Sequence, residues 1–202
     1  NTSGGFLHTP LDQLLVNAAA SVERGIGGVK LKVGQPDRAL DMKRVAAVRE
    51  HLGDAVPLMV DANQQWDRPT AQRMCRAFEE FNLVWIEEPL DAYDHEGHAA
   101  LAAMFDTPIA TGEMLTSAAE HADLIRHRAA DYLMPDAPRV GGITPFLKIA
   151  AQAEQAGLML GPHFAMELHV HLGAVYPTEP WVEHFDWLEP LFNERLEIKN
   201  RR

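Results

Sequence analysis

The sequence has one cysteine, Cys75, and no stretch of about 20 consecutive apolar residues, the length that spans a membrane. A single cysteine excludes an internal disulfide framework and favours a reducing compartment such as the cytoplasm. Cys75 lies between Met74 and Phe78 in a segment with the apolar spacing of an amphipathic helix. We therefore expect a packing residue there rather than a reactive thiol.

Basic residues are also scarce: 18 lysines and arginines stand against 29 aspartates and glutamates, for a formal net charge of −11. Nucleic-acid binding needs a basic face, so this composition excludes that class of protein. The chain of 202 residues has no linker or low-complexity segment. That length is enough for one domain with a well-buried core. Because the chain starts abruptly at Asn1 without methionine, we expect a fragment of a longer polypeptide.

Short apolar runs alternate with segments of helical periodicity along the whole chain. Helix-opening residues mark several of these segments: Pro10, Asp37, Pro69, and Ser117 with Glu120 in a capping-box pattern. The predicted strands lie at residues 1–8, 29–33, 56–60, 83–86, 108–111, 131–134, 158–160 and 181–183. Such alternation predicts parallel strands with right-handed crossovers. About eight strands predict a TIM-type barrel, with an open doubly wound sheet as the alternative.

Polar residues stand at the carboxyl ends of most predicted strands. Asp61, Glu87 and Glu113 are spaced by 26 residues, and Asp136 and His163 follow at steps of 23 and 27. In an open sheet, only two or three strands contribute to a site at the switch point. In a barrel, all strand ends face one mouth, where barrel enzymes have their active sites. The spacing therefore favours the barrel.

Three of these residues, Asp61, Glu87 and Glu113, are carboxylates on successive strands. Without a cation, three carboxylates at one mouth would repel one another, and at least one would take up a proton. Oxygen-only ligands suit a hard cation such as Mg²⁺, which keeps positions open for water and substrate. The alternative is three unrelated surface or capping acids, which their common register disfavours. The sequence therefore predicts a Mg²⁺ site.

Lys30 and Lys32 alternate on the strand before Asp61, so their side chains are predicted to point the same way. A lysine beside a divalent cation and a second lysine would lose proton affinity and become a general base near neutral pH. The alternative is that both lysines extend to solvent. Asn63, two residues beyond Asp61, is predicted either to orient water or substrate or to be an ordinary turn residue.

His163 and Asp136 stand at the ends of adjacent predicted strands. An aspartate bonded to one ring nitrogen fixes the tautomer and raises the basicity of the other nitrogen. We expect His169 and His171, on the following helix, to be surface or packing residues. Glu183 closes the predicted circle. If it faces the metal without binding it, we expect it to stay protonated and donate a hydrogen bond to an oxyanion.

Together these residues resemble the enolase superfamily, and within it the mandelate racemase subgroup, over nearly the whole chain. The motifs that carry the resemblance are Lys30-x-Lys32, Asp61-x-Asn63, Glu87-Glu88-Pro89, Gly112-Glu113, Asp136 followed by Gly141-Gly142, and His163. Residues 2–10, 61–67 and 162–167 look like those of acid-sugar dehydratases in this subgroup. A muconate-lactonizing enzyme would carry a lysine in place of the Asp136–His163 pair, so that branch is disfavoured.

The resemblance implies a (β/α)7β barrel over residues 1–187 with its first strand cut short, an incomplete C-terminal extension over 188–202, and no N-terminal α+β capping domain. It implies Mg²⁺ bound by Asp61, Glu87 and Glu113. Lys32, beside Lys30, would be the base on one face of the substrate. His163, paired with Asp136, would act on the opposite face, and Glu183 would donate a hydrogen bond to the enediolate.

The activity implied by the resemblance is dehydration of an acid sugar, most closely galactarate and/or L-talarate, by a homo-oligomer. Two alternatives stay open. One is a racemase, an epimerase or a dehydratase of another acid sugar in the same subgroup. The other is a fragment that binds metal without catalysis.

Overall fold

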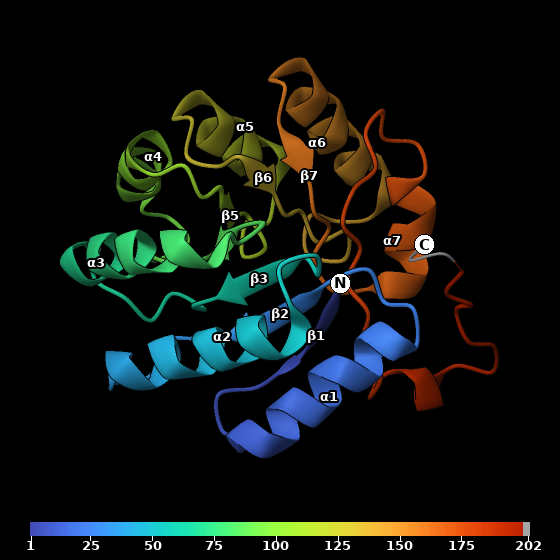
Figure 1. The fold of residues 1–202 in the computed structure, drawn as a ribbon. Coiled ribbons are helices and arrows are strands. Elements are labelled where there is room, and N and C mark those ends of the chain that lie inside the picture. The colour runs from blue at the N-terminus through green and yellow to red at the C-terminus, as the bar shows by residue number, and fades with distance from the viewer. Residues whose placement is uncertain (200–202) are drawn as a thin grey trace.

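The computed structural model describes residues 1–199, in which parallel strands alternate with α-helices (Figure 1). The strands are β1 (Thr2–Gly5), β2 (Val29–Lys32), β3 (Leu58–Asp61), β4 (Ile86–Glu87), β5 (Ile109–Thr111), β6 (Tyr132–Leu133) and β7 (Met159–Leu160). The helices are α1 (Leu11–Glu23), α2 (Arg38–Leu52), α3 (Arg68–Phe78), α4 (His95–Met104), α5 (Ala118–Arg126), α6 (Ile143–Gln155) and α7 (Met166–Gly173). Two 3-10 turns, η1 (Glu79–Phe81) and η2 (Glu189–Leu191), complete the elements of this part of the chain.

The strands follow one another in sequence order, β1 to β7, and every pairing is parallel. Residues 181–184 close the circle between β7 and β1. The amide of Trp181 donates to Leu160 O at 3.3 Å, and His184 forms a parallel bridge with Thr2. A doubly wound sheet would reverse its strand order at a switch point. The predicted (β/α)7β barrel is therefore confirmed, with residues 181–184 in the position of its eighth strand.

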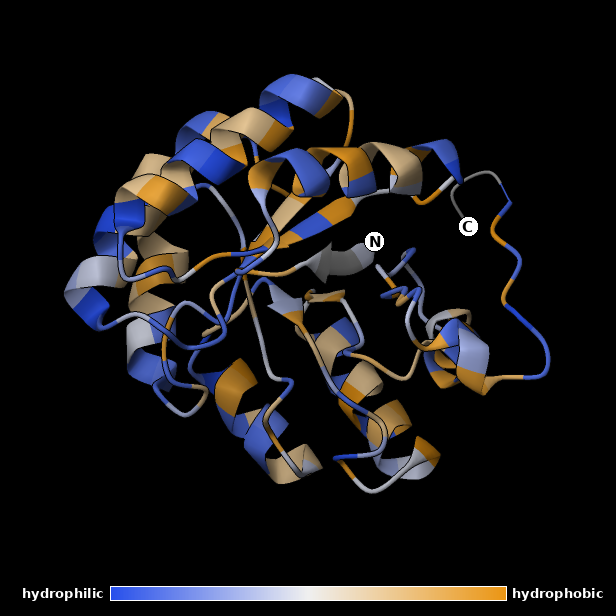
Figure 2. Cartoon of the chain, turned by 90° about the horizontal axis from the view of Figure 1, so that it is seen from below, coloured by the Kyte–Doolittle hydropathy of each residue, from blue (hydrophilic) through white to orange (hydrophobic). Residues whose placement is uncertain are grey.

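Alternation along the strands separates an inner layer from an outer layer. On β3, Leu58 and Val60 pack outward beneath the helices, whereas Met59 packs inside the barrel with Trp85 and Met134. The helices carry hydrophobic residues interleaved with hydrophilic ones (Figure 2), as expected for helices that cover a sheet on one side. The inner row of β3 continues from Met59 to a polar residue at the strand end, and this geometry positions the site.

Several predicted helix starts are confirmed by hydrogen bonds. The carboxylate of Asp37 accepts from the amide of Ala39, and the hydroxyl of Ser117 accepts from the amide of Glu120. The predicted capping box is confirmed, with one addition. The carboxylate of Glu120 hydrogen-bonds to the main chain of Ser117, and it also accepts from the amide of Thr116 at 2.6 Å.

Three boundaries differ from expectation. Of the apolar run at 83–86, only Ile86 belongs to the shorter strand β4, although Val84 and Trp85 also hydrogen-bond to the main chain of β3. The apolar spacing of Leu168, Leu172 and Val175 predicts a helix that reaches Val175, but helix α7 ends at Gly173 and Val175 is 68% exposed. Of the predicted C-terminal extension, residues 188–199 contain only η2, and residues 200–202 lie outside the described residues.

Two exclusions made from composition agree with the structure. Cys75 is fully buried, and burial raises the pKa of its thiol to about 12, so the expectation of a packing residue is confirmed. Within residues 1–199, no helix is both long and apolar enough to cross a membrane.

Candidate active site

The three predicted metal ligands meet at the carboxyl ends of β3, β4 and β5. Asp61, Glu87 and Glu113 are buried, and each offers one carboxylate oxygen within 4.8 Å of the others. Strand register produces this meeting, because Asp61 lies directly opposite Glu87 in the β3–β4 ladder. The amide of Asn63 donates to Asp61 Oδ1 at 2.8 Å, and the Trp85 indole donates to Glu87 Oε2 at 2.8 Å. Both hydrogen bonds orient a ligand carboxylate.

This donor set fits Mg²⁺. An octahedral Mg²⁺ with bonds of 2.0–2.1 Å holds neighbouring oxygens about 3 Å apart and opposite ones about 4 Å apart. Oxygens within 4.8 Å of one another reach those separations with small side-chain movements. Burial, first, and then the charge of Asp61 raise the pKa of Glu87 well above its ordinary value. Three buried acids this close are therefore costly to ionise together unless a cation joins them.

Lys30 lies deeper in the barrel than these acids, and it contacts Glu87 and a fourth acid, Glu183. Its ammonium donates to both carboxylate oxygens of Glu87, at 2.6 and 2.7 Å, and lies 2.6 Å from Glu183 Oε1. Burial lowers the pKa of Lys30, but Glu183, Glu87 and other acids outweigh it, so the pKa is well above the ordinary value. The prediction of a lysine with reduced proton affinity depends on a bound divalent cation and stays a prediction; the carboxylates around Lys30 by themselves stabilise its charge.

Lys32 occupies the outer end of the same strand face, as the alternation predicted. It pairs with Asp61 in the ladder, and its ammonium forms an ion pair with Asp61 Oδ2. Its side chain keeps 22% exposure, whereas that of Lys30 keeps 1%. Lys32 is thus the lysine of the two that a molecule entering the mouth can reach.

His163 and Asp136 form the predicted pair. His163 Nδ1 lies 2.8 Å from Asp136 Oδ2, and the other ring nitrogen lies 3.6 Å from Glu113 Oε1. Burial alone would raise the pKa of Asp136, but the His163 hydrogen bond and the amide of Arg139 lower it. An ionised Asp136 holds the proton of His163 on Nδ1 and leaves Nε2 toward the acids.

Glu183 faces the same site from the closing segment, but not in the predicted protonation state. Its Oε2 accepts from the amide of Phe164 at 2.5 Å, and its other oxygen pairs with Lys30. Burial alone would raise its pKa, yet Lys30 and His163 lower the pKa to about 2. The expectation of a protonated Glu183 is wrong in this structure, because a buried lysine supplies the charge that stabilises the ionised form.

Glu88 was not identified as a site residue from the sequence, although it adjoins Glu87. It is fully buried with a φ of +39°, and its Oε2 accepts from Gln64 Nε2 at 3.0 Å. Burial, and then the charge of Glu113, raise its pKa to about 8. The Glu-Glu-Pro motif is the signal that could have found it. Asn63, with a φ of +42°, has the backbone of a turn residue, and its predicted contact with substrate stays a prediction.

His169 proves to be more than a packing residue. It is fully buried, Nδ1 lies 3.1 Å from Phe164 O, and the amide of Ala137 donates to Nε2 at 3.2 Å. Burial lowers the pKa of His169, which favours the neutral ring. A neutral ring has one nitrogen that can accept the hydrogen bond from Ala137. Ala137 and Phe164 directly follow Asp136 and His163, so His169 ties the two supporting loops together. Its neighbour His171 is exposed, as expected.

Comparisons with known proteins agree with this geometry. The sequence profile of the family described as enolase C-terminal domain-like matches residues 13–202. The chain belongs to this family. The resemblance to the enolase superfamily is thereby confirmed, and among curated proteins this enolase-like chain is 69% identical to the L-talarate/galactarate dehydratase of Salmonella typhimurium. That similarity covers 100% of this chain and 51% of that protein.

Solved structures of the family superpose closely on the barrel. L-Talarate dehydratase from Polaromonas sp. JS666, complexed with Mg and L-glucarate, is 86% identical with a TM-score of 0.97, covering 100% of this chain and 56% of that one. The Salmonella typhimurium LT2 enzyme liganded with Mg and L-lyxarohydroxamate is 69% identical with a TM-score of 0.97, covering 100% and 51%. The chain thus spans about half the length of these relatives.

Proposed function

We propose that the whole protein containing this chain is a Mg²⁺-dependent acid-sugar dehydratase that acts on galactarate and/or L-talarate. The observation that carries the proposal is the placement of Lys32 and His163 at opposite ends of the acid triad. Lys32 pairs with Asp61, the first acid, and His163 lies beside Glu113, the third. Similarity to dehydratases named for these substrates supports the choice. We also propose a cytoplasmic homo-oligomer, which stays a prediction.

Asp61, Glu87 and Glu113 would hold the metal ion. When bound, Mg²⁺ supplies positive charge that stabilises the charge growing on the substrate carboxylate as the α-proton leaves, as is general for enolase-superfamily sites. Lys30, held between Glu87 and Glu183, would keep these acids in place. We propose that Lys30 and Glu183 line the substrate-binding side, with Glu183 as an ionised partner of Lys30 rather than as a proton donor.

The proton transfers fall to Lys32 and His163. One of them removes the α-proton, and the C–O bond at the β-carbon breaks. The hydroxyl leaves as water after taking a proton from the opposite group, and the enol ketonises to a keto-deoxy diacid. Asp136 holds the proton of His163 on Nδ1, so Nε2 exchanges protons with the substrate. The balance is loss of one water from the diacid.

A racemase or epimerase is the second candidate, because acid–base groups on two sides can also return the proton to the opposite face. This outcome would need the same residues without cleavage of the C–O bond. A metal-binding fragment without catalysis is the third, and it concerns the 202-residue chain alone. We expect little turnover from that chain by itself.

The test is incubation of the whole protein with Mg²⁺ and a library of acid-sugar diacids in ²H₂O. A keto-deoxy product from galactarate or L-talarate supports the proposal. Deuterium exchange or epimer formation without a keto product would favour the epimerase. The absence of both, in protein shown by calorimetry to bind Mg²⁺, would favour a metal-binding protein without this activity.

A further inference from the structure

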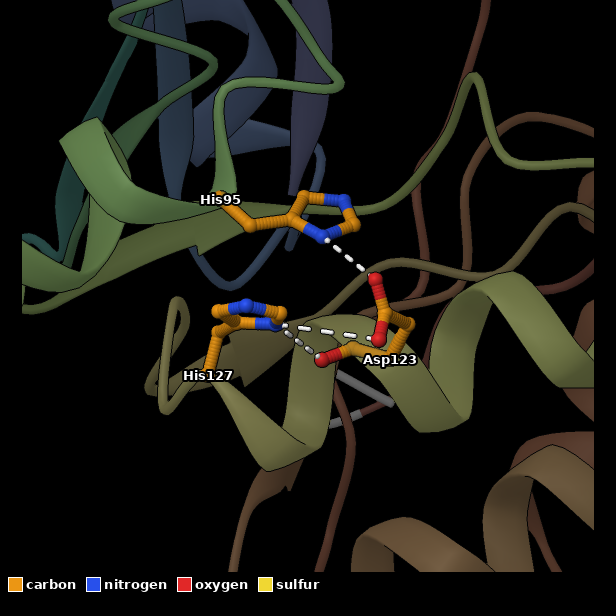
Figure 3. Close-up of side chains that lie close together, drawn as sticks. All are labelled: His95, Asp123 and His127. Atoms are coloured by element: carbon orange, nitrogen blue, oxygen red, sulfur yellow. Dashed lines mark hydrogen bonds and ion pairs between the residues drawn. The ribbon is translucent and has the colours of Figure 1, made fainter.

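We propose that His95, Asp123 and His127 form a second metal site, on the outer helix layer, for a divalent transition-metal ion such as Zn²⁺. The three side chains point toward one another from the start of α4 and from the C-terminal part of α5 (Figure 3). Each offers a ligand atom within 4.8 Å of the others. Two imidazoles and a carboxylate, with a position left for water, are a ligand set that Zn²⁺ accepts.

The distances within the group fit a shared ion. His95 Nδ1 lies 3.3 Å from Asp123 Oδ2, and two ligands of a tetrahedral Zn²⁺ with bonds near 2.0–2.1 Å are about 3.3 Å apart. Asp123 and His127 are four residues apart, a spacing that places two ligands on one side of a helix. The rings of His95 and His127 have centroids 5.5 Å apart.

Two existing contacts compete with the ion and would have to give way to it. Arg126 forms an ion pair with Asp123 Oδ1 while its side chain is 71% exposed, and such pairs contribute little stability. The oxygen facing His95 is the other one, Oδ2. His127 Nδ1 lies 2.9 Å from the main-chain oxygen of Asp123. The same nitrogen lies 3.8 Å from Asp123 Oδ1, so binding an ion through Nδ1 requires His127 to give up the hydrogen bond to the main chain.

A third cluster of potential ligands, His184, Asp186 and Glu189, shows the contrast. There Arg24 pairs with both carboxylates, Asp186 at 2.7 Å and Glu189 at 3.1 Å. Its guanidinium therefore occupies the position that a metal ion would need. In the His95 group, within residues 1–199, Arg126 pairs with Asp123 Oδ1, which also lies 3.8 Å from His127 Nδ1, and Asp123 Oδ2 is left to His95.

The position of the group gives the ion a structural role. The apolar residues under the helices form two clusters in residues 1–199, one from residues 14–109 and one mainly from 115–176. The two clusters meet at α4, where Leu101 belongs to the first and Ala99 packs against the second. His95 belongs to α4, whereas Asp123 and His127 belong to α5 and its end. An ion bound here would link the two halves of the helix layer.

The test uses the whole protein with Mg²⁺ present and Zn²⁺ as the probe, followed by calorimetry and thermal unfolding. The variants are His95→Gln and His127→Gln, and the matched control is His51→Gln, an exposed histidine on α2. We expect the natural protein and the control to bind one Zn²⁺ with the same affinity. In each variant the Zn²⁺ affinity should fall roughly tenfold or more, because loss of a residue that only supports a metal ligand already costs that much. Zn²⁺ should raise the unfolding midpoint of the natural protein and the control only.

Arg126→Gln separates a metal site from a set of surface ion pairs. Removing the competing guanidinium should leave Zn²⁺ affinity unchanged or raise it. Equal Zn²⁺ stoichiometry and affinity in the natural protein and both histidine variants would overturn the proposal. So would a loss of affinity in Arg126→Gln as large as that in His127→Gln. Because His127 is 43% exposed, its variant is expected to fold even if His95→Gln does not.

Discussion

Both ring nitrogens of His163 meet carboxylates in the predicted active site, Asp136 at 2.8 Å and Glu113 at 3.6 Å. General acid–base catalysis contributes typically 10²–10⁴-fold to a rate. We therefore expect His163→Asn to lower the rate of diacid dehydration by the whole protein by at least about 10²-fold. Steady-state rates measure this, with His51→Asn as control. Near-normal turnover by His163→Asn would remove this histidine from the mechanism.

Glu88 makes stability depend on pH. Its pKa is raised from 4.5 to about 8 by burial and by the charge of Glu113, so the native state holds a proton that the unfolded state has lost. Stability therefore falls as pH rises from 4.5 toward 8. Glu88→Gln mimics the protonated acid and keeps an oxygen for Gln64. We expect equal unfolding midpoints at pH 5 and a higher midpoint for the variant at pH 8.

The experiment for Glu88→Gln is thermal unfolding across this pH range with a chelator present, because a divalent ion would change the charge near Glu113. A difference of about 1 kcal/mol shifts the midpoint of a domain this size by roughly 2–4 °C. Parallel pH curves for the two proteins would show that Glu88 ionises with its ordinary pKa.

At the residue scale, the sequence could predict which residues lie in the site but not whether each of them is charged. Strand alternation placed Lys30 and Lys32 on one face, and the structure confirms it. The protonation of Glu183 was predicted wrongly, because it depends on Lys30 lying 2.6 Å away across the barrel. Spacing along the chain does not contain such a distance. His169 was underestimated for the same reason, since its two partners come from separate loops.

Helix α7 acts on the site through His169, which contacts both loops that carry the acid–base pair. His169→Leu removes the hydrogen bonds to Ala137 and Phe164 and leaves a buried amide without its partner. A small misplacement of a reacting group costs rate steeply. We expect kcat per folded enzyme to fall by about tenfold or more, with a smaller change in KM.

Two further variants show whether a loss of kcat in His169→Leu comes from its lost hydrogen bonds. His169→Gln offers an amide donor and an acceptor to the same two partners, so it should recover most of kcat. His171→Leu, exposed on the same helix, should leave kcat unchanged. If His169→Leu lowers only the unfolding midpoint and not kcat per folded enzyme, the histidine is a packing residue, as the sequence first suggested.

The strands show why elements were easier to predict than their ends. Seven of the eight predicted strands have a counterpart, because short apolar runs between helix starts are a strong signal. The eighth, predicted at 181–183, is replaced by a single bridge at His184. The ladder is shorter than the apolar run at 83–86, where Leu83 and Trp85 are buried although they lie outside β4. Both faces of a barrel strand are covered, so a residue there is apolar whether or not it pairs with the next strand. Apolar composition therefore does not show where a strand begins or ends.

At the scale of the whole molecule, closure of the barrel was predicted from the recurrence of polar strand ends, and the structure confirms it. The cluster of His95, Asp123 and His127, at α4 and α5, was not predicted. Its members are 28 and 4 residues apart and share no spacing with the strand-end series. Only the packing of the helix layer brings them together.

The net charge of the chain bears on how the proposed diacid substrate would approach the site. With 18 basic and 29 acidic residues, the chain repels a doubly charged diacid at long range, and only the site's own lysines and metal attract it. Salt screens charges beyond a Debye length of about 10 Å at 0.1 M and weakens that repulsion. We expect kcat/KM for the diacid to stay level or rise slightly as NaCl increases from about 0.02 to 0.2 M. A neutral viscogen series controls for diffusion. A steep fall in kcat/KM would mean instead that a positive surface, from this chain or from the rest of the protein, steers the substrate to the mouth.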